Sequence, residues 1–288
     1  MTGSNIYIFQ VDAFTKKPFS GNPAAVCITD SKMEEGWMQK VAQEMNLSET
    51  AFLWPSNDKS FNLKWFTPTT EVDLCGHATL AAAKILFSQN YLSQSEKNEI
   101  TFNTNSGKLT ANLIDNMIEL DFPIEREVAL EEYDELIRAL RIGYSSIKFV
   151  GKNQFDFLVE VESEEKLGEI APDHNKLAEL TERGVIVTSA SSLPSYDFVS
   201  RFFAPAVGVA EDPVTGSAHC NLGPYWKDRL HKDELIAYQD SDRGGEIKVK
   251  VDEQNDRVIL GGQAVVVFKG RLYCANKLLI KDCVKVQL

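Results

Sequence analysis

Alternating and clustered apolar positions predict a mixture of strands and helices. Ile6–Ala13 and Ala24–Ile28 have the alternation of strands, and Thr50–Trp54 is a short apolar run that also predicts a strand. Ser31–Met45 instead has apolar side chains at helical spacing, with Ser31 as the candidate N-cap. Gly76–Phe87 is apolar on nearly all sides and lacks proline, so it predicts a buried helix.

The second half of the chain shows a similar mixture. Glu127–Arg141 and His174–Arg183 have the pattern of amphipathic surface helices. A helix beginning at Gly216 should be shorter than the one at Gly76, because Gly223-Pro224 should kink or end it. The break between the halves is expected near Phe122-Pro123.

Three features of the first half recur in the same order in the second half. Lys64-Trp-Phe-Thr-Pro68 recurs 137 positions later as Arg201-Phe-Phe-Ala-Pro205, and the small-residue run at Gly76 recurs 140 positions later at Gly216. The alternating segments that begin at Gly107 and Gly245 are 138 positions apart, and each is followed by a polar turn and a return strand.

This repetition predicts an α/β protein built from two similar halves. We expect residues 1–122 to form the first half and residues 123–277 the second, and we allow residues 278–288 to return to the first. An approximate two-fold axis would relate the halves, and the cleft between them would be a natural ligand site.

Composition excludes several classes of protein. The net charge is −12 and the thirty lysines and arginines are dispersed, which argues against nucleic acid as a partner. Apolar runs are too short for a membrane span, and the N-terminus lacks the basic region of a signal peptide. Five cysteines without a Cys-x-x-Cys pair are typical of reduced thiols, so we expect a cytoplasmic protein.

Two helix starts offer a place for an anion. The segments before Gly76 and Gly216 each lead from a loop into a helix, whose first N–H groups and positive dipole end suit a carboxylate. Two such starts facing one cleft would form a local anion pocket in an acidic protein. Ordinary capping by Asp212 or Thr215 is an equally good interpretation at this point.

Glu49 is the candidate acid–base group. It stands between a helix end and an apolar strand, where partial burial would raise its pKa and let it accept and return a proton. A solvated loop glutamate is the competing interpretation, and residue spacing alone favours it. His77 could relay a proton or complete a hydrogen bond in the core. Cys75-Gly-His77 and His219-Cys220 have no second pair at standard zinc spacing, so we expect no metal site.

Motifs along almost the whole chain resemble the PhzF family of phenazine biosynthesis-like proteins, which share the diaminopimelate epimerase fold. The resemblance begins at Pro18-Phe-Ser-Gly-Asn-Pro23, continues through Asn46-Leu-Ser-Glu-Thr-Ala-Phe52 and Gly76-His-Ala-Thr79, and resumes at Glu211-Asp-Pro-Val-Thr-Gly-Ser-Ala218. It implies two pseudo-symmetric halves, each with a curved, largely antiparallel sheet around a central helix. A homodimer is also implied.

The resemblance further implies an isomerase that acts on a small cyclic amino or hydroxy carboxylate, such as a dihydro-hydroxyanthranilate, without a cofactor. Glu49 would remove a proton from one ring carbon and return it to another. His77 and Asp212 would assist by hydrogen bonding and proton handling. The residues that would bind the substrate are Ser48, Gly76, Gly216 and Ser217.

Two other functions are compatible with the sequence. Related racemases and epimerases use two opposed cysteines, one from each half, but only Cys75 occupies such a place here, and Cys220 lies about one helical turn further along. Two-thiol racemisation is therefore disfavoured, although a racemase or epimerase stays open and would depend on Cys75. The other alternative is a non-catalytic protein that binds a small carboxylate.

Overall fold

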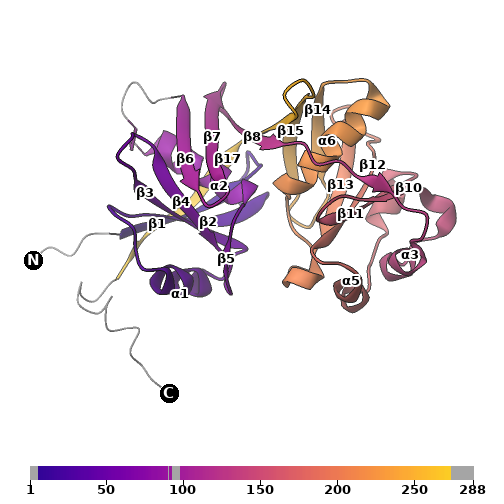
Figure 1. Ribbon diagram of the computed structural model, residues 1–288, viewed down its shortest axis with the longest axis horizontal. Coiled ribbons are helices and arrows are strands. Elements are labelled where there is room, and N and C mark those ends of the chain that lie inside the picture. The colour runs from indigo at the N-terminus through magenta and orange to yellow at the C-terminus, as the bar shows by residue number, and fades with distance from the viewer. Residues whose placement is uncertain (1–5, 90, 93–97, 274–288) are drawn as a thin grey trace, which may run out of the picture. The chain divides into compact units, whose positions relative to one another are not determined.

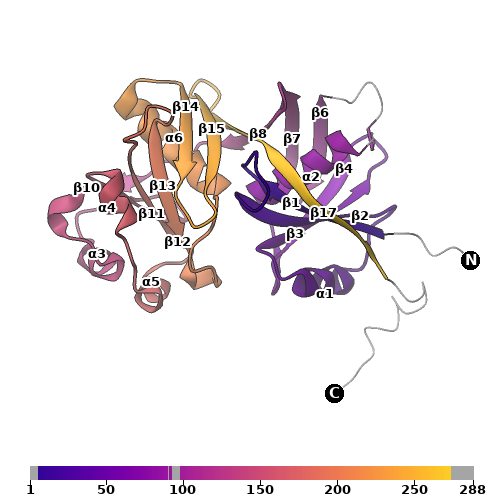
Figure 2. The ribbon, with the colours of Figure 1, turned by 180° about the vertical axis from the view of Figure 1, so that it is seen from behind.

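The computed structural model describes residues 6–89, 91–92 and 98–273. The chain divides into two compact units (Figures 1 and 2). Of the described residues, the first contains 6–19, 23–89, 91–92, 98–120 and 263–273, and the second contains 20–22 and 121–262. Each unit is a mixed α/β structure in which paired strands pack against one central helix, α2 in the first unit and α6 in the second.

In the first unit, eight strands follow one another across the sheet in the order β17–β1–β2–β3–β4–β6–β7–β8, and short β5 adds to β4. Helix α2 packs against β1, β3, β7 and β17. The elements of this unit are β1 (Ile6–Ala13), β2 (Asn22–Ile28), α1 (Glu35–Met45), β3 (Glu49–Pro55), β4 (Phe61–Phe66), β5 (Glu71–Val72), α2 (Gly76–Ser88), β6 (Glu99–Thr104), β7 (Gly107–Ile114), β8 (Met117–Pro123) and β17 (Ala264–Leu272).

In the second unit the strands follow one another in the order β9–β10–β11–β12–β13–β14–β15–β16. Helix α6 packs against β14, β15 and β16. The elements are β9 (Val128–Ala129), α3 (Asp134–Leu140), the 3₁₀ turn η2 (Tyr144–Ser146), β10 (Ile147–Lys152), β11 (Asp156–Val161), α4 (Glu164–Gly168), α5 (His174–Leu180), β12 (Gly184–Ala190), β13 (Phe198–Phe203), η3 (Pro205–Val207), α6 (Gly216–Leu230), β14 (Glu234–Gln239), β15 (Gly245–Asp252) and β16 (Arg257–Gly262).

Strand pairing confirms the predicted repeat. From β2 to β8, successive pairs run parallel, antiparallel, parallel, antiparallel and antiparallel. From β11 to β16 the same series occurs in the same order. Phe66 and Phe203, which the sequence repeat aligns, pair with Thr50 of β3 and Val185 of β12, so the two ladders also agree in register.

The strand after each return hairpin belongs to the other unit. After β8 the chain forms β9, which pairs with β10, and after β16 it forms β17, which pairs with β1. The observed division at 120/121 therefore lies beside the predicted one at 122/123. The second unit ends at 262 and not at 277, because β17 hydrogen-bonds to β1. The expectation for residues 278–288 lies outside the described residues.

The helix predicted from Ser31 begins later than expected. Helix α1 starts at Glu35 with Glu34 in the N-cap position, so Ser31 is not the cap. The Thr29 hydroxyl donates to the carbonyl of Ser31 at 2.8 Å, and this turn holds the segment before the helix.

The helix predicted over Glu127–Arg141 is wrong in its first half. Val128–Ala129 forms β9, and only Asp134–Leu140 is helical. Pairing of β9 with β10 outweighs the helical pattern there. In contrast, α5 (His174–Leu180) covers most of the predicted His174–Arg183.

Helix α6 was expected to be shorter than α2, but it has 15 residues and α2 has 13. Pro224 lies inside α6 and cannot donate to the carbonyl of Cys220. The backbone N–H of Glu125 takes that place at 3.1 Å. The helix therefore continues past the proline without an unsatisfied carbonyl.

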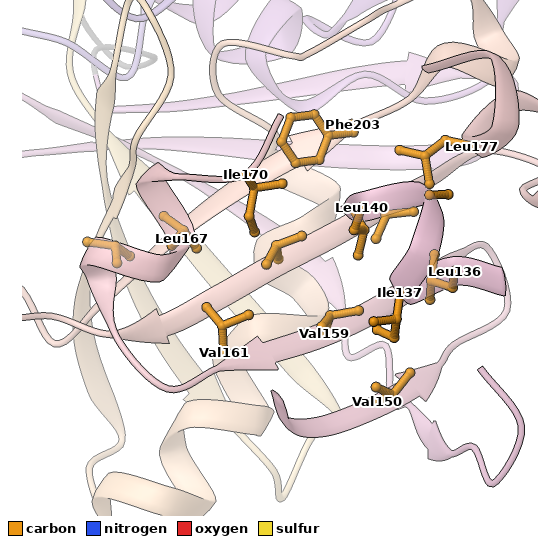
Figure 3. Close-up of a cluster of buried hydrophobic side chains, with 14 residues drawn as sticks. Leu136, Ile137, Leu140, Val150, Val159, Val161, Leu167, Ile170, Leu177 and Phe203 are labelled. Atoms are coloured by element: carbon orange, nitrogen blue, oxygen red, sulfur yellow. The ribbon is translucent and has the colours of Figure 1, made fainter. Parts of the chain in front are cut away.

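Apolar side chains of the three short helices α3, α4 and α5 cover one face of the second sheet (Figure 3). Leu136, Ile137 and Leu140 of α3 pack with Val150 and Val159 of the sheet. Leu167 and Leu177 extend this cluster from α4 and α5. In the part of the chain that the structure describes, no helix has the length and apolar character needed to cross a membrane.

Candidate active site

Glu49 lies at the start of β3, beside Ala24 in the parallel ladder with β2. Its side chain is 19% exposed and the Oε2 atom is turned into the protein, away from solvent. The alternative of a solvated loop glutamate is therefore wrong. Strand pairing fixes the backbone of Glu49, so the carboxylate is held at a defined place in the unit.

His77 places an imidazole against this carboxylate. It is the second residue of α2, its side chain is 7% exposed, and its Nε2 atom lies 3.1 Å from Oε2 of Glu49. Burial acts to lower the pKa of His77, but contacts with Cys75 and Glu49 outweigh burial, so the pKa is raised well above its usual value. The pair is a compact acid–base unit with little access to bulk water.

Cys75 contacts the other nitrogen of the same ring. Its Sγ atom lies 3.5 Å from Nδ1 of His77, and burial together with the Glu49 charge raises the pKa of the thiol. A thiol is therefore the stable form of Cys75 at neutral pH.

Glu49, Cys75 and His77 also form a donor set that a metal ion could use. One donor atom from each lies within 4.8 Å of the others, and sulfur, nitrogen and oxygen are all ligands that Zn²⁺ accepts. Each ring nitrogen of His77 faces a different one of these partners, Nδ1 the Cys75 sulfur and Nε2 the Glu49 carboxylate. The absence of a resident metal stays a prediction.

In the second unit, Asp212 lies between β13 and α6 and is held from two sides. Asn22 donates through Nδ2 to Oδ1 of Asp212 at 2.9 Å and to the carbonyl of Val214 at 2.8 Å. The hydroxyl of Thr215 donates to Oδ2 of Asp212. Both carboxylate oxygens thus have fixed donors, and the orientation of Asp212 is set before any ligand binds.

Gln239, a fully buried residue at the end of β14, fixes the backbone beneath this carboxylate. Its Nε2 donates to the carbonyl of Asp212 at 2.8 Å, and its Oε1 accepts from the N–H of Thr215 at 2.8 Å. Sequence reasoning missed Asn22 and Gln239. Asn22 lies within the Pro18–Pro23 motif, but no role was assigned to it, and Gln239 is a polar residue at the end of a strand, which commonly marks a turn.

Both central helices begin without a side-chain cap. Neither Cys75 before α2 nor Thr215 before α6 makes a capping hydrogen bond, since Thr215 bonds to Asp212 instead. Capping by the Thr215 side chain is therefore the wrong interpretation. The first-turn N–H groups of α2 and α6 have no acceptor within their own helix, as at any helix N-terminus.

The predicted site residues fall into two groups. The first unit holds Ser48, Glu49, Gly76 and His77, and the second holds Asp212, Gly216 and Ser217. Within the first group the structure brings Glu49 and His77 into contact. Gly216 is buried, and Ser48, Gly76 and Ser217 are partly exposed. Their assignment to substrate binding stays a prediction.

The second unit does not repeat the chemistry of the first. Strand register makes Gly184 the counterpart of Glu49, and the 140-residue offset makes Ser217 the counterpart of His77 and Thr215 that of Cys75. A Cβ atom at Gly184 would lie 2.6 Å from the Phe202 ring and 2.7 Å from the carbonyl of Phe203. The second unit therefore has no room for a glutamate at the place that Glu49 occupies in the first.

Comparison with known proteins agrees with this fold. Residues 11–270 match the family model of PhzC-PhzF, the phenazine biosynthesis-like proteins. An uncharacterized isomerase of Halalkalibacterium halodurans is 54% identical over 92% of this chain and 97% of its own length. A solved PhzF-family structure from Enterococcus faecalis is 40% identical, covers 94% of this chain and 100% of that one, and has a TM-score of 0.87. A predicted epimerase from Pseudomonas aeruginosa, 21% identical over 94% of this chain and 100% of that one, has the same fold at a TM-score of 0.75.

The fold and these relatives define an isomerase with an epimerase-like α/β architecture. More narrowly, the chain belongs to the PhzC-PhzF family of phenazine biosynthesis-like proteins. The expected family, fold class and enzyme class are all confirmed.

Proposed function

We propose that this protein is a cofactor-independent isomerase that moves a proton between two carbon atoms of a small cyclic amino or hydroxy carboxylate. A dihydro-hydroxyanthranilate is one such compound. Glu49 is the general base that takes the proton and the general acid that returns it. His77 and Asp212 assist by hydrogen bonding and by balancing charge.

The observation that carries this proposal is the 3.1 Å contact between Glu49 and His77 in a largely buried place. A carboxylate that must both take and return a proton needs a neighbour that adjusts to its two charge states. His77 supplies that neighbour, because it changes charge near physiological pH when its surroundings allow. Burial keeps bulk water from competing for the proton.

The uncapped N-termini of α2 and α6 support the assignment of a carboxylate substrate. Helix N-termini attract anions through free N–H groups and the helix dipole. This local attraction matters because the whole chain has a net charge of −12, which repels anions at longer range. Backbone atoms of Gly76, Gly216 and Ser217, with the side chain of Ser48, would bind the carboxylate.

An amino-acid racemase or epimerase is a weaker candidate. Inversion at one carbon needs a base and an acid on opposite faces, and two thiols could serve. Thr215 is the counterpart of Cys75, while Cys220 is buried with its Sγ atom 3.8 Å from the carbonyl of Gly216 in its own helix. Cys220 therefore does not fit the part of the second acid–base thiol that such a racemase would need.

The reaction type can be tested by incubating the protein with a panel of cyclic amino and hydroxy carboxylates in deuterium oxide. We expect a product with a shifted double bond and deuterium at a new carbon, seen by proton NMR, and the same rate after dialysis against EDTA. Deuterium at an inverted carbon without a shifted double bond would indicate a racemase. Ligand-dependent thermal stabilisation without exchange would indicate a binding protein.

Two further expectations belong with this proposal. A homodimer is expected from the family, and light scattering coupled to gel filtration measures it. A cytoplasmic location fits the thiol states of Cys75 and Cys220, because buried reduced cysteines are typical of reducing compartments.

A further inference from the structure

Cys75 carries a buried thiol that the proposed proton transfer does not use. It occupies the N-cap position of α2, is 8% exposed, and makes no capping hydrogen bond. Its Sγ atom instead lies 3.5 Å from Nδ1 of His77, two residues along the chain. A core cysteine needs no such partner, so the direction of this thiol requires an explanation.

The two nitrogens of His77 have different tasks. Nε2 faces the Glu49 carboxylate at 3.1 Å, and a carboxylate there favours a proton on Nε2 whether the ring is neutral or charged. Any change in the charge of His77 therefore takes place at Nδ1. Glu49 and Cys75 both act on the ring and raise the pKa of His77.

A group that contacts Nδ1 in both charge states of His77 must be able to donate and to accept a hydrogen bond. In the neutral ring Nδ1 is an acceptor, and in the imidazolium it is a donor. A thiol meets both needs, because its S–H donates weakly and its sulfur accepts weakly. A carbonyl or an amide N–H at the same place would favour one state over the other.

The second unit provides an independent parallel. Thr215 is the counterpart of Cys75 at the 140-residue offset, and its hydroxyl also bonds to a charged residue of the candidate site, Asp212, instead of capping its helix. In both units the residue before the central helix orients a charged side chain. The shared pattern argues against chance packing of Cys75.

We propose that Cys75 is a positioning residue that holds the His77 ring with its proton on Nε2, facing Glu49, in both charge states of the imidazole. The predicted effect of Cys75 on the reaction rate rests on the proposed function. The orientation of the ring follows from the contacts alone. Cys75 itself stays a thiol and does not carry the transferred proton.

The chain has four histidines, His77, His174, His219 and His231, so ¹⁵N labelling of histidine gives a spectrum in which each ring can be assigned. Long-range proton–nitrogen spectra report which nitrogen bears the proton and how the ring titrates. We would compare wild type with Cys75→Ser, which keeps a donor and acceptor, and with Cys75→Ala and Cys75→Val, which have neither. Cys220→Ala, in the other unit, is the matched control.

We expect wild type and Cys75→Ser to keep the Nε2–H form of neutral His77. Cys75→Ala and Cys75→Val should show a mixture of Nδ1–H and Nε2–H forms and a shifted titration of His77, and Cys220→Ala should match wild type. In the proton-exchange assay, loss of one such hydrogen bond should slow exchange about 3- to 10-fold, with the loss mainly in kcat.

An unchanged His77 spectrum and titration in both Cys75→Ala and Cys75→Val would overturn the proposal. A mixture of forms in Cys75→Ser equal to that in Cys75→Ala would also overturn it. Cys75→Val fills the thiol volume, so it keeps the test decisive where Cys75→Ala does not fold. Failure of the proposed function would show separately, as wild-type protein that catalyses no exchange while its His77 spectrum follows these expectations.

Discussion

Nε2 of His77 lies 3.1 Å from Oε2 of Glu49, although the two residues come from different elements, the second residue of α2 and the first residue of β3. Packing of α2 against β3 brings them together. The contact joins the proposed general base to a group that can balance its charge. The contact is shielded because α2 is buried. On a surface helix, water would solvate both side chains.

The raised pKa of His77 predicts a pH-dependent contribution to stability. A histidine whose folded-state pKa lies above its unfolded value binds its proton more tightly when folded, so its stabilisation is complete below the unfolded pKa of about 6.5. It is lost as the pH rises through the raised folded-state pKa. We expect His77→Gln to unfold more easily than wild type by roughly 1–3 kcal/mol at pH 6.

Urea titrations at pH 6, 7.5 and 9 would measure this difference. The gap between wild type and His77→Gln should shrink toward high pH. His174→Gln is the control, because it removes a histidine without changing the Glu49 contact. A gap that grows with pH would contradict the assigned charge of His77.

Gln239 is expected to contribute to both stability and activity, although it is not one of the proposed catalytic residues. Gln239→Met keeps the approximate volume but leaves the N–H of Thr215 and the carbonyl of Asp212 without this partner. The expected loss of stability is about 1–3 kcal/mol for each buried group left unpaired. The unfolding temperature and kcat of Gln239→Met should both fall. Gln43→Met, on the exposed side of α1, should change neither. Equal behaviour of the two variants would refute this role.

Asp212 and Glu49 are proposed to serve one reaction, and a double-variant cycle tests this. Glu49→Gln and Asp212→Asn should each reduce the exchange rate strongly. Residues that act in the same step are far from additive, so the double variant should be little slower than the worse single variant. A double variant slowed by the product of the two single effects would indicate independent roles.

Pro224 offers a test of the fold itself. Because Glu125 already satisfies the carbonyl of Cys220, Pro224→Ala should change stability by less than about 1 kcal/mol. Lys84 is the counterpart of Pro224 at the 140-residue offset, in the regular helix α2, and Lys84→Pro should cost about 3 kcal/mol or more. Chemical denaturation of both variants gives the comparison. A large gain from Pro224→Ala would show that the proline strains α6.

The repeat and the buried helices could be predicted from the sequence because they depend on local pattern. The punctuation around Gly76 and Gly216 indicated two equivalent helices, and the alternation around Gly107 and Gly245 indicated equivalent strands. Helices α2 and α6 confirm the first prediction, and the matching strand ladders confirm the second. Glu49 and His77 could also be named, through resemblance and through the helix start.

Other features depend on contacts between distant segments, which a local pattern does not contain. The return of β17 to β1 joins positions more than 250 residues apart in the sequence, so the boundary at 277 was placed too late. The continuation of α6 past Pro224 needs the N–H of Glu125, about 100 positions earlier. Asn22 contacts Asp212 across 190 positions, and the local pattern of the Pro18–Pro23 motif does not specify that contact.

The central claim is that Glu49 carries the proton. The most direct measurement is the rate of deuterium incorporation into a turned-over cyclic amino carboxylate by wild type and by Glu49→Gln, with thermal shift confirming that the variant still folds and binds. We predict a loss of about 10²–10⁴-fold in Glu49→Gln with binding retained. Equal incorporation by the two proteins would contradict the account.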